Sequence, residues 1–271
     1  MRHFAYQKEA AFYNGVTLED IHGENKSDIL GIGAVASAGG ICGRGILLDY
    51  HAWRQKQGKA HDAFASNSIP LSDLLAVAKD QGTEIKFGDI LIIRSGYMAA
   101  YNALSRSEVA AMRERQPLRF TGIQQSEEMM EWLWTNFSAA AGDHPSLECW
   151  PTQEEYALHE VLLAGWGMPI GELFDLEELG KHCAEIGRWS FFITSKPTYV
   201  RRMTSHYSLM RMWYTRLTSI QGSRWCSQSA KRDCALLKAR PNTAPTNAVC
   251  PVVTHLHESA ALAALLCRND C

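Results

Sequence analysis

The stretch Gly88-Asp89-Ile90-Leu91-Ile92-Ile93-Arg94-Ser95-Gly96-Tyr97 decides the fold class. Its apolar centre is continuous for four residues and ends in a polar turn. A short apolar run bounded by turn residues is typical of a strand that is buried on both faces, as strands of parallel sheets are. The sequence therefore predicts a central strand of an α/β domain at residues 88–97.

Further apolar runs alternate with helical patterns along the chain. The predicted extended segments are residues 46–50, 138–143, 170–174 and 189–194. The predicted helices are residues 70–82, 105–115, 126–137, 154–163 and 176–186, with the Met and Trp stripe at 129, 130, 133 and 134 facing the core. Residues before about position 37 are predicted to be loop. Strands that alternate with helices indicate an α/β fold with a largely parallel or mixed sheet flanked by helices.

Composition changes near Lys196. The chain up to that residue has 17 Lys and Arg against 26 Asp and Glu, whereas the last 75 residues have 10 against 3. Nineteen of the 20 glycines also lie in the first part, and only Gly222 lies in the second. We therefore expect one domain at residues 1–196, followed by a divergent, basic tail at 197–271. No fold is predicted for this tail, which we expect to be poorly ordered.

Cellular location and partners can be partly predicted. Only three of the eight cysteines, Cys42, Cys149 and Cys183, lie in the first part, and no C-x-x-C pair is present. The start lacks the apolar segment of a secretory signal, and no run of about 18 apolar residues exists to span a membrane. A cytoplasmic protein without a membrane partner is expected. The tail is basic but contains no recognisable nucleic-acid-binding motif, so nucleic acid is not an expected partner.

Three residues are candidates for chemistry. His159 and Glu172 are thirteen residues apart, and a helix followed by an extended segment can bring such a pair to one metal ion. Spacing alone favours the simpler interpretation of two polar residues with local hydrogen bonds, and a metal site needs three or more protein ligands. His3 taken alone is typical of a solvated terminal residue. The turn at residues 143–146 can orient substrate or support ligands, although such a sequence more often forms a local Asx turn.

Several segments together resemble the cyclase family that includes bacterial kynurenine formamidase, and especially its longer fungal members. The resemblance covers roughly residues 2–196. Its most informative segments are Arg2-His3-Phe4, Phe12-Tyr13-Asn14-Gly15-Val16-Thr17, Gly43 to Tyr50, Gly88 to Tyr97, Ala141-Gly142-Asp143, and Leu158-His159 through Gly171-Glu172 to Leu176.

The resemblance implies a swivelling β/α/β-type fold and a divalent metal, zinc or manganese. In this family an H-x-x-x-H-x-D-x-x-x-H segment and a later His and Glu hold the metal. His159 and Glu172 match the later pair as metal ligands, and His3 matches the last His of the segment, which acts as the catalytic acid/base. The implied reaction is hydrolysis of an N-formyl arylamine such as N-formylkynurenine, a step of tryptophan catabolism. A small-molecule substrate and a homodimer are also implied.

Two departures from the family pattern leave several hypotheses open. The chain begins after the positions of the earlier ligands, and the match stops at residues 194–197. The first hypothesis is an amidohydrolase whose sequence is incomplete through a late start codon and a frame shift or retained intron. The second is a catalytically inactive binding or regulatory protein whose basic tail contacts an acidic partner. The third is a chain that lacks closing strands and does not fold stably.

Overall fold

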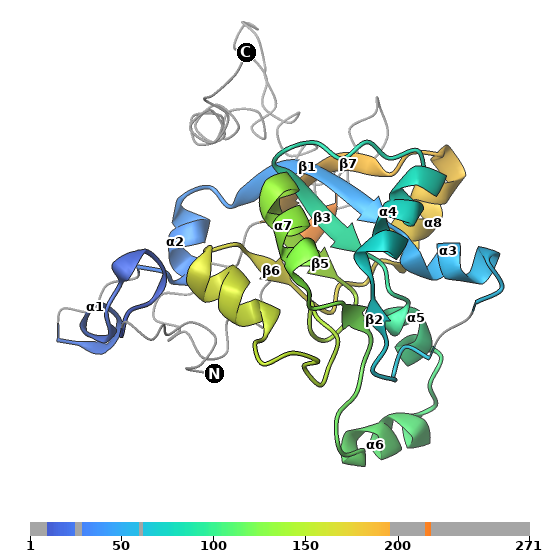
Figure 1. Cartoon of the computed structure of the whole chain (residues 1–271), viewed down its shortest axis with the longest axis horizontal. Coiled ribbons are helices and arrows are strands. Elements are labelled where there is room, and N and C mark those ends of the chain that lie inside the picture. Colours follow the sequence, from blue (N-terminus) through green and yellow to red (C-terminus); the bar gives the residue numbers. More distant parts are fainter. Residues whose placement is uncertain (1–9, 25–28, 60–61, 196–214, 218–271) are drawn as a thin grey trace, which may run out of the picture.

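The computed structural model describes residues 10–24, 29–59, 62–195 and 215–217 (Figure 1). Most of the predicted tail at 197–271 lies outside these residues. None of the described helices is long and apolar enough to cross a bilayer.

A six-stranded mixed sheet forms the centre of the molecule. Its strand order is β6-β5-β3-β1-β7-β8. The first four of these are parallel, β7 runs antiparallel to β1, and β8 runs antiparallel to β7. This arrangement confirms the predicted α/β fold with a mixed sheet. The bounds of the strands are β1 Ile41–Leu48, β3 Asp89–Ile93, β5 Phe137–Gly142, β6 Ile170–Gly171, β7 Ser190–Ser195 and β8 Thr215–Leu217.

The alternation of side chains in β1 and β3 divides the core between the two faces of the sheet. Leu48 and Ile93 join a cluster that includes residues of helices α4 (Leu71–Asp80) and α7 (Glu127–Asn136). Leu47 and Ile92 join the opposite cluster with Cys183 of helix α8 (Glu177–Ile186). Helices therefore cover both faces of the sheet (Figure 1), and the central strand β3 is buried at every position because neither of its faces is exposed to water.

The remaining elements are short and mostly connect the strands. The first 37 residues are not all loop, as predicted, because they contain two short helices, the first of which begins with a capping box between Thr17 and Asp20. The bounds predicted for the helix at 154–163 are also wrong, because the π-helical turn found there begins later and ends later, at Glu160–Gly165. These elements are the 3₁₀ turn η1 Tyr13–Gly15, α1 Leu18–His22, α2 Ile32–Ser37, α3 Tyr50–Lys56, α5 Tyr97–Asn102, α6 Arg106–Glu114, the π-helical turn η2 Glu160–Gly165, and the paired strands β2 Ser68–Ile69 and β4 Gly122–Ile123.

Helix α7 corrects one prediction about the core. Met129 and Leu133 are fully buried, as their spacing of four residues predicts. Trp134 is instead 61% exposed, and its ring lies 4.9 Å from that of Trp166. The residue after Leu133 is rotated by about 100° around the helix, so Trp134 leaves the buried stripe and packs at its edge.

Candidate metal centre

The carboxyl ends of the four parallel strands meet at one edge of the sheet, where ligands of open α/β sheets generally bind. Polar residues follow each strand there. Asp49 follows β1, Arg94 follows β3, Asp143 and His144 follow β5, and Glu172 follows β6. The sheet therefore gathers at one edge several of the groups that the sequence scatters over more than a hundred residues.

At this edge the imidazole of His159 lies between two carboxylates. Its Nε2 is 2.9 Å from Oε1 of Glu172, and its Nδ1 is 2.7 Å from Oε2 of Glu148. The side chain of Glu148 is only 1% exposed, whereas those of His159 and Glu172 are 16% and 15% exposed. The structure thus brings His159 and Glu172 together, as the resemblance led us to expect, and adds Glu148.

Glu172 is held by the turn that follows β5. The backbone N–H of Leu147 donates a hydrogen bond of 3.1 Å to Oε1 of Glu172. The next residue, Leu173, has a left-handed backbone with φ of 56°, and its N–H donates to the carbonyl of His144 at 3.1 Å. A left-handed leucine is unusual and needs support from its surroundings. These contacts fix the Glu172 carboxylate and the residue that follows it.

The two carboxylates control the charge of His159. Burial alone would lower the pKa of His159, but its contacts with Glu148 and Glu172 outweigh burial and raise that pKa to about 10. Burial would likewise raise the pKa of Glu148, but the hydrogen bond from His159 outweighs it and lowers that pKa. At neutral pH the cluster is therefore one imidazolium between two carboxylates, which leaves an excess of one negative charge.

Nε2 of His159 and Oε1 of Glu172 lie at ion-pair distance. Nitrogen and oxygen ligands lie about 2.0–2.2 Å from a tetrahedral zinc and are therefore roughly 3.4 Å apart, so the pair, which is 2.9 Å apart, would have to lose its shared proton and separate slightly to hold an ion. A carboxylate on the second nitrogen, here that of Glu148, is the usual support of a metal-binding histidine. Among the described residues, however, no group of three or more His, Cys, Asp and Glu side chains is placed to hold an ion. Further ligands would have to come from outside those residues.

The sequence predictions for this site have mixed outcomes. His159 and Glu172 are in contact, while their role as metal ligands stays a prediction. His3 lies outside the described residues, so its role as acid/base also stays a prediction. Glu148 was missed. A signal was available, because a lone carboxylate between the apolar neighbours Leu147 and Cys149 indicates a buried charge, and buried charges are normally paired.

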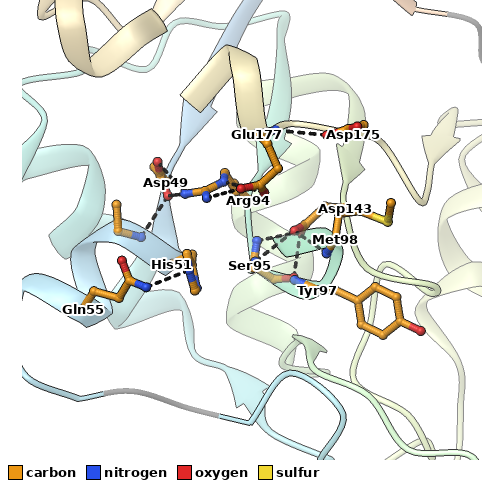
Figure 2. A network of polar contacts seen from close by, with 12 residues as sticks. Asp49, His51, Gln55, Arg94, Ser95, Tyr97, Met98, Asp143, Asp175 and Glu177 are labelled. Atoms are coloured by element: carbon orange, nitrogen blue, oxygen red, sulfur yellow. Dashed lines mark hydrogen bonds and ion pairs between the residues drawn. The ribbon is translucent and has the colours of Figure 1, made fainter. Parts of the chain in front are cut away.

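A second polar network supports the same edge of the sheet (Figure 2). The guanidinium of Arg94 bonds Asp49 at 2.9 Å and Glu177, in the first turn of α8, at 2.6 Å. Burial would lower the pKa of Arg94, but these two carboxylates raise it above its ordinary value. The pairing ties the ends of β1 and β3 to α8.

Asp143 binds the loop after β3 rather than forming only the local Asx turn that its sequence suggested. Its Oδ1 accepts hydrogen bonds from the N–H and Oγ of Ser95 at 2.6 and 2.7 Å. Its Oδ2 accepts from the N–H groups of Gly96 at 2.9 Å and Met98 at 3.3 Å (Figure 2). A fully buried carboxylate is thus satisfied by four donors, and it joins the ends of β3 and β5.

His144 is fully buried, and among the described residues neither of its ring nitrogens makes a hydrogen bond of good geometry, although the backbone of Ser146 is close enough to act on its pKa. Burial lowers its pKa, which outweighs the opposite effects of Asp143 and Glu172. Gly142 makes room for the ring, because a Cβ there would overlap the imidazole. His144 is therefore a neutral, unsatisfied polar group packed beside the Glu172 segment.

Comparison with known proteins decides the family. The family model described as "Putative cyclase" matches residues 9–148, which is more than half of the chain. The chain belongs to this cyclase family. This chain is similar to a solved structure described as a crystal structure of a novel cyclase, with a TM-score of 0.59 and 29% identity over 72% of this chain and 61% of that chain. This chain thus spans less than two thirds of that protein.

Isatin hydrolase A from Ralstonia solanacearum is more distant, with a TM-score of 0.43 and 15% identity over 63% of this chain and 59% of the hydrolase. Comparison with curated proteins gave no match. The family and the fold are thereby shown, while the narrower resemblance to kynurenine formamidase and to fungal members stays a prediction.

Proposed function

We propose that this cyclase-family protein is a metal-dependent hydrolase that cleaves an amide bond in a small molecule. The observation that supports the proposal best is the contact of 2.9 Å between Nε2 of His159 and Oε1 of Glu172, with Glu148 on the other ring nitrogen. In the proposed site His159 and Glu172 would hold a zinc or manganese ion together with ligands from outside the described residues. Such an ion, when bound, polarises the substrate carbonyl and lowers the pKa of a water molecule.

The protein's own residues supply orientation and proton transfer. Glu148 accepts a hydrogen bond from Nδ1 of His159, and Leu147 fixes Glu172 through its backbone N–H. In the hydrolysis the water oxygen forms a bond to the carbonyl carbon, and the carbon–nitrogen bond breaks. The leaving amine must gain a proton, and His3 is the group that the family pattern assigns to this transfer. An N-formyl arylamine such as N-formylkynurenine is the proposed substrate.

The test uses the full chain purified without metal and then supplied with Zn²⁺ or Mn²⁺. We expect about one ion per chain and release of formate from N-formylkynurenine, with loss of turnover after chelation. His159→Ala and Glu172→Gln should abolish turnover, whereas Glu155→Ala, a change of an exposed glutamate in the neighbouring loop, should not. Bound metal without turnover on N-formyl arylamines would refute the proposed substrate but leave a metal site.

A binding protein without catalytic activity is the second candidate. It is favoured by the finding that the described residues bring together fewer than three side chains able to hold an ion. Protein that binds neither metal and hydrolyses no N-formyl arylamine, yet shows salt-sensitive binding to a polyanion, would support this candidate. Stoichiometric metal with turnover would exclude it.

A further inference from the structure

An aromatic surface lies where helix α7 meets the end of the π-helical turn η2. Trp134 of α7 is 61% exposed, and its ring lies 4.9 Å from that of Trp166, the residue that follows η2. Tyr13, which is 40% exposed, lies against the next residue, Gly167, where a Cβ would overlap the Tyr13 ring. Single exposed apolar residues are common, but tryptophan is enriched among the residues that dominate binding at interfaces. Trp134, Trp166 and Tyr13 together are called the aromatic surface below.

The side chains of α7 beside the aromatic surface are acidic. Glu127, Glu131 and Trp134 are four and three residues apart, so they share one face of the helix, and both glutamates are exposed. The sequence of α7 contains no Lys or Arg. Within the part of the chain that the structure describes, neither glutamate forms an ion pair. An occupant of this surface must therefore supply positive charge together with apolar side chains.

We propose that this chain's own segment 218–240, which lies outside the described residues, docks on the aromatic surface. The segment has five Lys and Arg against one acidic residue, Asp233, and it also contains Trp225 and Leu236. Basic side chains bind the faces of tryptophan rings as well as carboxylates, so the segment offers both kinds of contact. Its charge is also opposite to that of residues 1–196, which hold 17 Lys and Arg against 26 Asp and Glu.

The segment is long enough to reach the surface while β8 stays in the sheet. Strand β8 ends at Leu217 on one edge of the sheet, and Trp166 precedes β6, which forms the opposite edge. Neighbouring strands are about 4.8 Å apart, so six strands are roughly 24 Å wide. The 23 residues of the segment span up to about 75 Å when extended. This length exceeds the width of the sheet about threefold and allows a path around the helices.

The docked segment would lie close to the candidate site without being part of it. The turn η2 begins directly after His159 and ends directly before Trp166. A segment bound at Trp166 therefore restrains one end of the turn whose other end carries His159. The docking uses neither His159 nor a metal ion, so it can be tested independently of the proposed hydrolysis.

Photo-cross-linking in the full chain tests the docking. Benzoylphenylalanine is placed at the exposed Thr135, next to Trp134, and the linked peptides are identified by mass spectrometry after irradiation. We expect links to residues 218–240, with a yield that falls several-fold in about 1 M NaCl, where the screening length is about 3 Å. Trp134→Ala and Glu131→Lys should each lower the yield several-fold, after a thermal melt has shown that both variants are folded.

The control places the same probe at Ile186 of α8. Ile186 is 46% exposed and follows the exposed Glu185, but α8 packs on the opposite face of the sheet, where the described residues include no pair of tryptophans in ring contact. Glu185→Lys is the matched control for charge reversal and should leave the yield at Thr135 unchanged. Equal yields at the two probe positions, no link to residues 218–240, or yields that neither surface variant lowers would overturn the proposal. Links between ¹⁵N-labelled and unlabelled chains in a mixture would also overturn it, because the occupant would then come from a second copy.

Discussion

Replacement of Asp143 by Asn tests how the sheet edge is built. The carboxylate is fully buried and accepts four hydrogen bonds, two at Oδ1 from Ser95 and two at Oδ2 from the N–H groups of Gly96 and Met98. Asparagine has almost the same shape but only one acceptor oxygen. Whichever way the amide is turned, its NH₂ group faces two donors.

The cost follows from these contacts. Asp143→Asn loses two charge-assisted hydrogen bonds, and it leaves buried backbone N–H groups against another donor or without a partner. Each unsatisfied buried group costs about 1–3 kcal/mol, so we expect the free energy of unfolding to fall by about 3–5 kcal/mol. The stability of a whole domain is only about 5–15 kcal/mol, so the effect is large enough to approach unfolding.

Urea unfolding of the full chain at pH 7 measures the difference, with an unchanged slope required for the comparison. The control is Asp62→Asn, because the exposed Asp62 accepts a single hydrogen bond, from the N–H of Phe64 at 2.9 Å, and should cost less than about 1 kcal/mol. A loss for Asp143→Asn no larger than that of the control would refute the reasoning.

Three further predictions concern the same edge. His144→Phe removes two ring nitrogens that make no hydrogen bond among the described residues but puts a larger ring in a packed site, so the gain and the strain should nearly cancel and the free energy of unfolding should change by less than about 1 kcal/mol. A loss above about 3 kcal/mol on urea unfolding would show that the imidazole has a hydrogen-bond partner. In metal-free protein, the pKa of His159 rises from 6.5 to about 10 on folding, so its contribution to stability is complete below pH 6.5 and is lost as the pH rises to about 10. Wild type should therefore lose more stability between pH 7 and 10 than His159→Gln, and parallel pH profiles would contradict this. Lysine in place of Arg94 cannot bond both Asp49 and Glu177 with one planar group, so urea unfolding of Arg94→Lys should show a loss of about 2–4 kcal/mol in the free energy of unfolding. A loss below about 0.5 kcal/mol would show that this network does not stabilise the fold.

The central elements were predictable because their signals are local. The apolar run at residues 90–93 needs only its own composition and flanking turns to indicate a buried strand, and β3 lies there. Helix α7 followed equally from the spacing of Met129 and Leu133. The short helix α1 was missed because five residues give no measurable period, although the Thr17 and Asp20 capping box marked its start.

The candidate site was predictable only in part. His159 and Glu172 were chosen through the family resemblance, since their spacing alone favoured a simpler interpretation. Glu148 and Asp143 acquire their roles through tertiary contacts that no local pattern encodes. The donors of Asp143 lie 45–48 residues earlier in the chain, and they face it only because β3 and β5 are neighbouring parallel strands.

The turn after β5 explains why the fold and the site are difficult to separate. Within residues 143–148, Asp143 binds the loop after β3, Leu147 binds Glu172, and Glu148 binds His159. A change in the length of this turn would move both proposed ligands and release the β3 loop together. Substitutions at Glu148 leave the contacts of Asp143 and the N–H of Leu147 in place and act first on His159, which the carboxylate contacts at both its backbone N–H and its ring. The proposed function therefore depends on the length of this turn, whereas the orientation of the histidine depends on one side chain within it.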